Sequence, residues 1–157
     1  MSSRRSIFAA VIVAAVAWGG VAAADMSRNV IAAFKGELVI SKGDLPEGKN
    51  DKETIAKIKA ERLKELTGEA KGDVTGWFFH YTAFLTKTGV SELTMEFWNG
   101  KKLAANKRIN GFDPKLPVLS SDLPIDEDEG LTKGTAYVVK LVTEKNVVVA
   151  QTPLVMK

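Results

Sequence analysis

The stretch of sequence that decides the fold is LTKGTAYVVKLVT, residues 131–143. Its apolar residues alternate with other residues, so that Tyr137 and Leu141 share one face while Lys140 lies on the other. That two-residue period is typical of a β-strand with one face in a core. Residues 147–156 follow after a short polar connection, which predicts a closing hairpin.

Strand patterns recur through the rest of the chain. Asn99 and Gly100, between two of them, are the strongest two-residue signal for a β-hairpin. Segment 77–87 is aromatic on both faces, which predicts a strand covered on both sides at least at one end. The predicted strands are 30–41, 77–87, 93–98, 101–109, 118–120, 135–143 and 147–156. About seven short strands separated by turn residues indicate a mainly β protein, an antiparallel β-sandwich.

One α-helix is predicted near residues 51–67. Asn50 is placed to cap it, with Glu53 three residues later, and Gly68 stands where a C-terminal capping glycine belongs. A single apolar stripe runs along it, formed by Ile55, Ile58, Leu63 and Leu66. Because this stripe is narrow, we expect an accessory helix on the surface of the sandwich.

The corner before the strand at 135–143 carries a family resemblance. Leu131, Gly134, Thr135, Tyr137 and Val139 form an L-x-x-G-T-x-Y-x-V pattern. This pattern resembles the corner before the penultimate strand of fibronectin type III and related immunoglobulin-like domains. The resemblance implies a buried Tyr137 ring whose hydroxyl bonds the backbone upstream, with Leu131 and Gly134 shaping the corner.

A second fold fits the order of the predicted elements. A strand, a helix and then a run of antiparallel strands is also the order in the cystatin-like α+β fold, where a sheet wraps one helix. Such a helix needs a broad apolar face, so the narrow stripe favours the immunoglobulin-like sandwich.

Residues 1–24 have the pattern of a signal peptide. Arg4 and Arg5 precede an uncharged apolar run, and three alanines stand directly before Asp25. This is the pattern after which signal peptidase cuts, so one domain at 25–157 is expected in the periplasm or outside the cell. Two alternatives stay open: the apolar run remains as a membrane anchor, or residues 3–8, which resemble a twin-arginine signal, direct export of the folded chain.

Composition excludes several classes of function. The formal net charge is +3, and two of the basic residues, Arg4 and Arg5, belong to the predicted signal. A nearly neutral domain gives no electrostatic basis for binding nucleic acid, and contact with a membrane is expected only if the signal stays attached. The chain has no cysteine, which excludes disulfides, thiolate metal sites and a thiol nucleophile.

Few residues have the pattern of a catalytic or metal site. His80 is the only histidine, so no site with paired imidazoles can form. A catalytic triad would require His80 beside a serine and a carboxylate, and no serine stands in a nucleophile-elbow pattern. The serines considered are Ser27, Ser41, Ser91, Ser120 and Ser121. His80 is therefore predicted to be a packed or half-exposed sheet residue, and neither catalysis nor a cofactor is expected.

Two charged segments are candidate binding surfaces. An acidic segment offers Asp122, Asp126 and Asp128 as calcium ligands, but it lacks the spacing of an EF-hand and is predicted to be a solvated loop. A basic hairpin could contact a partner or protect a sheet edge, and it carries Lys101, Lys102, Lys107 and Arg108.

The expected function follows from export and fold class. We expect a non-catalytic binding or structural module of the bacterial envelope, whose partner is a protein or an envelope polymer. Two alternatives remain: a chaperone or inhibitor that adds a strand to its partner, and a small periplasmic enzyme that uses carboxylates.

Overall fold

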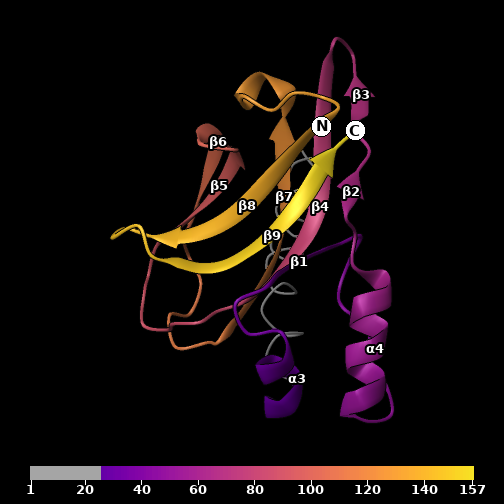
Figure 1. Ribbon diagram of the computed structural model, residues 1–157, viewed down its shortest axis with the longest axis vertical. Coiled ribbons are helices and arrows are strands. Elements are labelled where there is room, and N and C mark those ends of the chain that lie inside the picture. The colour runs from indigo at the N-terminus through magenta and orange to yellow at the C-terminus, as the bar shows by residue number, and fades with distance from the viewer. Residues whose placement is uncertain (1–25) are drawn as a thin grey trace, which may run out of the picture.

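The computed structural model describes residues 26–157, so the predicted signal peptide at 1–24 lies outside the described residues. Figure 1 shows two layers of strands, with two helices gathered at one end of the molecule. Between residues 26 and 157, neither helix is long and apolar enough to span a membrane. The mainly β sandwich with an accessory helix is confirmed, and the cystatin-like alternative, with one sheet around one helix, is wrong.

The first sheet is organised around β4 (Val74–Phe84). On one side, β7 (Val118–Asp126) pairs with β4 from Gly76 to Phe84. On the opposite side, β1 (Leu38–Ser41) and the short β3 (Glu69–Lys71) pair with its two ends. All three neighbours run antiparallel to β4, which makes it the centre of the sheet.

The second sheet has five strands in the order β2-β9-β8-β5-β6. Their bounds are Glu65–Leu66 for β2, Val148–Met156 for β9, Thr135–Thr143 for β8, Leu93–Asn99 for β5 and Lys102–Ile109 for β6. The hairpins predicted around Asn99–Gly100 and around residues 144–146 are both present. The strand β2 runs parallel to β9, whereas the other pairs are antiparallel.

Hydrogen bonds join the two sheets along one side. Leu63, just before β2, donates its N–H to the carbonyl of Ile40 in β1 at 2.8 Å. The neighbouring Lys64 accepts from the N–H of Val155 in β9 at 3.0 Å. Residues 63–66 therefore connect β1, at the edge of one sheet, to β9 of the other, and we call this connection the seam. The seam satisfies backbone groups that an open edge would leave exposed.

The two faces of β4 belong to two different apolar clusters. Trp77, Phe79 and Tyr81 enter the main core between the sheets. Phe84, on the other face, packs with Phe34 in a smaller cluster under the helices. Phe78 lies on that same face farther along the strand and is 43% exposed. The prediction of a strand covered on both sides at one end is therefore confirmed.

The predicted strand at 30–41 is wrong over its first part. Residues Arg28–Ala33 form the helix α3, and only Leu38–Ser41 form a strand. Ser27 caps α3 by accepting a hydrogen bond from the N–H of Val30, and Val30 and Phe34, one helical turn apart, both enter the small cluster. Local capping and a helical period therefore outweighed the imperfect alternation.

The predicted helix near 51–67 is too long. The helix α4 (Asp51–Glu61) ends at its C-cap Arg62, and Leu66 lies in β2. Asn50 does cap it, by accepting from the N–H of Glu53 at 2.9 Å. Residues 63–66 leave the helix because they bond to both sheet edges. That strand and β3 raise the strand count from the expected seven to nine.

The predicted short strand at 118–120 continues to Asp126 as β7. Pro124 lies within it, opposite Phe78. The position tolerates proline because β7 is an edge strand and Pro124 lacks only an N–H that would point away from β4. Asp122 and Asp126 are consequently strand residues, which corrects the prediction of an acidic loop for these two.

Candidate functional site

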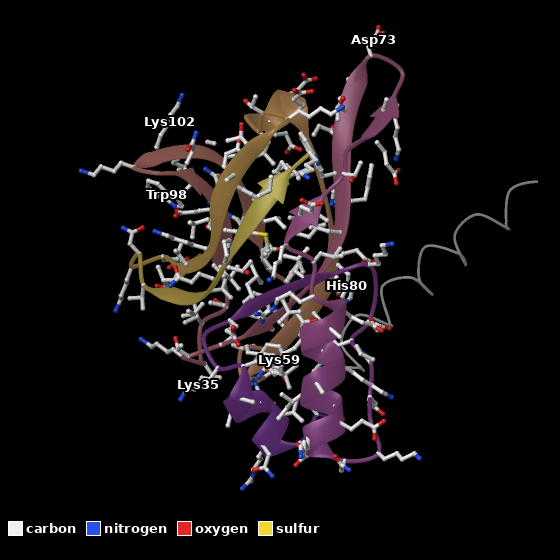
Figure 2. All side chains as sticks on the ribbon, turned by 45° about the vertical axis from the view of Figure 1, so that its right-hand side comes forward. Lys35, Lys59, Asp73, His80, Trp98 and Lys102 are labelled. Carbon is white, nitrogen blue, oxygen red and sulfur yellow. The ribbon has the colours of Figure 1, made fainter. Side chains whose placement is uncertain are left out.

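Two groups of polar or exposed side chains lie outside the cores, one on each sheet. The first, which we call the His80 cluster, consists of His80, Ser120 and Asp122. The second, which we call the apolar row, crosses the outer face of the five-stranded sheet and consists of Leu103, Trp98, Val138 and Pro153. Figure 2 shows Trp98 on the β5–β6 hairpin, well away from His80.

Strand pairing assembles the His80 cluster. In the register of β4 and β7, His80 lies opposite Asp122 and Thr82 lies opposite Ser120. Side chains two residues apart on a strand share a face, so Ser120 and Asp122 both flank the imidazole. Two neighbouring strands thus bring the three side chains together, although they are far apart in sequence.

Both ring nitrogens of His80 have hydrogen-bond partners. Nδ1 lies 2.8 Å from Oδ1 of Asp122, and Nε2 lies 2.6 Å from Oγ of Ser120. The hydroxyl of Thr82 is 3.3 Å from the same Oγ. An ionised carboxylate only accepts hydrogen bonds, so Nδ1 donates to Asp122; in the neutral ring Nε2 then accepts from Ser120.

Burial differs sharply within the cluster. His80 is 4% exposed and Ser120 is partly exposed, whereas the side chain of Asp122 is 86% exposed. Asp44, from the loop after β1, brings a second carboxylate oxygen to 3.5 Å from Nε2. The imidazole is therefore fixed from both ends and shielded from water, while solvent reaches the carboxylates.

The cluster lies at the boundary between covered and open parts of the sheet. On its face of β4, Thr82 and Phe84 are buried on one side of His80, and Phe78 is exposed on the other. The structure thus confirms the prediction of a packed His80. The sequence did not predict that Ser120 and Asp122 would bond its two nitrogens.

The apolar row is built by four neighbouring strands. Trp98 of β5 lies opposite Leu103 of β6 and Val138 of β8, and Val138 lies opposite Pro153 of β9. Leu103 and Val138 are each 38% exposed, and Pro153 is exposed. Sequence reasoning missed this row. The signal for it was Val138, an apolar residue at an outward position in an alternating strand.

Two charged neighbours hold Trp98 in place. Its Nε1 donates to Oε2 of Glu96 at 2.7 Å. The Nζ of Lys140 lies 5.3 Å from the centre of the ring, within the range of a cation–π interaction. The indole is therefore positioned before any ligand arrives, which lowers the entropy lost on binding.

The four basic residues of the predicted partner surface do not form one surface. Lys101 and Lys102 lie at the turn beside the apolar row. Lys107 forms an ion pair with Glu129. Burial raises the pKa of Glu129, but the hydrogen bonds from Lys107 and from the N–H of Asp126, with the charge of Lys107, lower it below its usual value. Arg108, on the opposite face of β6 from Lys107, lines a hollow of about 280 Å³ with Glu92, Glu96 and Glu144. The basic charge of the hairpin is thus divided and partly neutralised.

The calcium candidates are dispersed as well. Asp122 bonds His80, Asp126 is the N-cap residue of the short 3-10 helix η1 (Glu127–Glu129) and donates its N–H to Glu129, and Asp128 lies within that helix. Within residues 26–157, no three side chains of His, Asp or Glu are grouped so as to hold a metal ion.

Tyr137 occupies the corner expected from the sequence. It is 4% exposed, and its hydroxyl accepts a hydrogen bond from the N–H of Thr132 at 2.8 Å. Leu131 beside it is 1% exposed, and Gly134 has a φ of +84°, which favours glycine. All three residues named for the corner therefore contribute to it. Their role is structural, because Tyr137 and Leu131 are buried and Gly134 has no side chain.

A hollow of about 410 Å³ lies between the start of α3 and the start of α4. Met26, Val30 and Leu45 supply apolar lining, and Asp51 supplies a carboxylate. That carboxylate accepts hydrogen bonds from Ser27 at 2.7 Å and Asn29 at 2.8 Å. It joins the two helices and is already occupied in doing so.

Comparison with known proteins does not assign a function to the His80 cluster or to the apolar row. No protein-family model matches the chain, and no curated protein shows significant sequence similarity to it.

Proposed function

We propose that this chain is an exported immunoglobulin-like binding module of the bacterial envelope, and that the apolar row holds a protein partner. Export rests on the signal pattern at 1–24, and the binding surface rests on the row. The single observation that carries the proposal is the alignment of Leu103, Trp98, Val138 and Pro153 across four strands on an outer face.

The strand order supports the immunoglobulin-like part of the proposal. In such domains, strands A, B and E pair in one sheet and strands C, F and G in the other. Here β1, β4 and β7 stand in the first set of positions, and β5, β8 and β9 stand in the second, with β6 as C′. Tyr137 near the start of β8 makes the hydrogen bond of a tyrosine corner in strand F.

The chemistry of the row favours a protein over an envelope polymer. Three of its four residues are aliphatic or proline, which match apolar side chains of a protein and offer no hydrogen bonds to sugar hydroxyls. Its aromatic residue, Trp98, is the type most enriched among residues that dominate protein interfaces. Exposed apolar residues that lie side by side, rather than singly, are typical of interaction sites.

Strand addition to a partner is less well supported. Strands β6 and β7, on the side away from residues 63–66, each pair with one neighbour only. Lys107 and Arg108 on β6, and Asp122 and Pro124 on β7, are residues that hinder pairing with another strand. Binding through a sheet face requires neither a free edge nor a catalytic group.

Photo-crosslinking in living cells tests the proposal. A photoreactive residue at position 138 should form a crosslink to a protein, whereas one at Val147 should not. Val147 is the matched control because it is also an exposed valine, at 43%, but lies in the β8–β9 turn. The crosslink at 138 should disappear when Trp98→Ala is added, since removing a dominant interface residue lowers affinity by about 30-fold or more.

Equal crosslinking at positions 138 and 147 would contradict a specific surface. Binding of the purified chain to isolated envelope polymer, abolished by Trp98→Ala and with no protein crosslink, would replace the protein partner by a polymer. Recovery of uncleaved chain only from the cytoplasm would remove the envelope setting.

A further inference from the structure

We propose that Ser120, His80 and Asp122 form a nucleophile–base–acid triad that hydrolyses small carboxylic esters. This activity lies on the opposite sheet from the apolar row and does not depend on the binding function proposed for that row. It also departs from the non-catalytic role expected from the sequence.

The order of contacts is the one that acyl transfer requires. The hydroxyl of Ser120 bonds Nε2 of His80 at 2.6 Å, and Nδ1 of the same ring bonds Asp122 at 2.8 Å. In a serine hydrolase the base takes the proton of the nucleophile through one nitrogen while the acid holds the other. Recognition of a triad depends on this geometry and not on the sequence positions of its members.

The environment supports each role. His80 is 4% exposed and both its ring nitrogens have partners, so its ring is held in one orientation, while Ser120 is partly exposed. Asp122 and Asp44, whose oxygens lie 2.8 and 3.5 Å from the two ring nitrogens, both favour the imidazolium that forms during the reaction. Because solvent reaches both carboxylates, their effect is screened and the activity should be modest.

The edge position of β7 provides a donor for the oxyanion. Leu85 donates its N–H to the carbonyl of Pro117. In an antiparallel pair only every second residue bonds to the neighbouring strand, so this bond shows that residues 117, 119, 121 and 123 face β4 with their main-chain groups. The main-chain groups of Ser120 and Asp122 therefore point away from β4, toward the open edge of the sheet. The N–H of Ser120 is thus available on the nucleophilic residue itself to stabilise negative charge on the carbonyl oxygen.

The reaction proceeds in two balanced halves. Oγ of Ser120 attacks the ester carbonyl carbon while its proton passes to Nε2, and collapse of the tetrahedral intermediate breaks the carbon–oxygen bond of the ester. The leaving alcohol takes the proton from Nε2, and the acyl group remains on Ser120. Water then attacks the acyl carbon while Nε2 takes one of its protons. The bond between the acyl carbon and Oγ breaks, Oγ takes the proton from Nε2, and the carboxylic acid is released.

Labelling of the unmodified full chain is the first test. An alkyl fluorophosphonate should phosphonylate Oγ of Ser120 with loss of fluoride, giving one adduct that peptide mass spectrometry places at residue 120. Ser121 is the built-in control, because it is exposed on the same strand, on the opposite face, and its hydroxyl does not contact His80. Absence of an adduct at Ser120 under excess reagent, or equal labelling of Ser121, would overturn the triad.

Hydrolysis of p-nitrophenyl acetate is the second test. Ser120→Ala and His80→Gln should each lower the rate by about 10²- to 10⁴-fold, the usual contribution of general base catalysis, and Ser121→Ala should leave it unchanged. Asp122→Asn should reduce the rate less, because the Asp122 side chain is 86% exposed. Near-UV circular dichroism identifies variants that fail to fold; a folded Ser120→Ala variant with the wild-type rate would rule the proposal out.

Discussion

At the scale of single residues, Tyr137 shows how one side chain ties a connection to the sheet that follows it. Its ring is buried in the main core, and its hydroxyl reaches back to the N–H of Thr132. The bond satisfies a backbone donor in the connection between η1 and β8. The connection is therefore anchored by a residue that belongs to the core.

Substitution of Tyr137 separates the hydrogen bond from the packing. Tyr137→Phe should lower the free energy of unfolding by about 1 kcal/mol, and Tyr137→Ala should lower it by about 3 to 5 kcal/mol because a cavity forms. Chemical denaturation measures both changes. Tyr81→Phe is the matched control: Tyr81 is also buried, and burial raises its pKa to about 12, so it stays protonated at neutral pH. An unchanged denaturation midpoint for Tyr137→Phe would show that the hydroxyl contributes nothing.

At the scale of elements, α3 and α4 are joined through one carboxylate. Asp51, in the first turn of α4, accepts from Ser27, the N-cap of α3, and from Asn29 within α3. The hydrogen bond from Ser27, followed by that from Asn29, lowers the pKa of Asp51 below its usual 3.8. The helix pair covers one end of β4, so this carboxylate supports the small apolar cluster indirectly.

The lowered pKa gives the α3–α4 contact a predictable pH dependence. A group whose folded-state pKa is depressed stabilises the fold above its unfolded pKa and loses that effect as the pH falls through the folded value. At pH 6, Asp51→Ala should therefore melt at a lower temperature than the wild type, and the difference should shrink below about pH 3.8. Thermal scans across this range provide the measurement.

Asp73→Ala is the control for that series. Asp73 is exposed at the tip of the β3–β4 hairpin, as Figure 2 shows, and removing it should not produce the same difference at pH 6. A melting difference between Asp51→Ala and the wild type that is constant from pH 6 to pH 3 would show that the Asp51 charge is not involved.

At the scale of the whole molecule, the described residues gain their stability from two apolar clusters and a closed seam between the sheets, without disulfides. Within residues 26–157 the calcium candidates are not grouped around a common point. Asp122 contacts His80, Asp126 is the N-cap residue of η1 and Asp128 lies within η1, and the segment lacks the glycine turn that folds carboxylates around calcium.

Millimolar Ca²⁺ should therefore leave the melting temperature almost unchanged. A ligand present at one hundred times its dissociation constant adds about 2.7 kcal/mol, which for a domain of this size shifts the melting temperature by roughly 5 to 15 °C. A thermal scan resolves such a shift, and Mg²⁺ serves as the control for general screening. Stabilisation by Ca²⁺ alone, lost in the double variant Asp126→Asn and Asp128→Asn, would establish the site.

The sequence predicts elements whose evidence is local. The strand at Thr135–Thr143 and the hairpin at Asn99 and Gly100 follow from alternation and turn chemistry within a few residues. The α3 segment was misassigned because the apolar residues Val30 and Phe34, four positions apart, share a face in either a strand or a helix, and the Ser27 cap decides between the two. Residues 63–66 left the predicted helix for a reason outside the segment, namely hydrogen bonds to two distant strands.

Short-range sequence patterns do not predict the two candidate sites. The neighbours of His80 follow from the register of β4 against β7, and a shift of one residue would turn Ser120 and Asp122 to the other face. Trp98 and Val138 become neighbours only when β5 pairs with β8. Chemistry that depends on strand pairing therefore requires the structure.

The part of the seam where β2 and the residues after it pair with the end of β9 also has a consequence for the timing of folding. Lys157 donates its N–H to Leu66, and its carbonyl accepts from Gly68 and from the indole of the fully buried Trp77. A chain that emerges from its N-terminal end lacks these partners until residues 148–157 have appeared, and contacts between such distant segments form slowly. The seam should therefore close late, so the chain stays incompletely folded until its C-terminal residues are present. A protease that removes the last few residues from the C-terminus should likewise free Leu66, Gly68 and Trp77 from these hydrogen bonds.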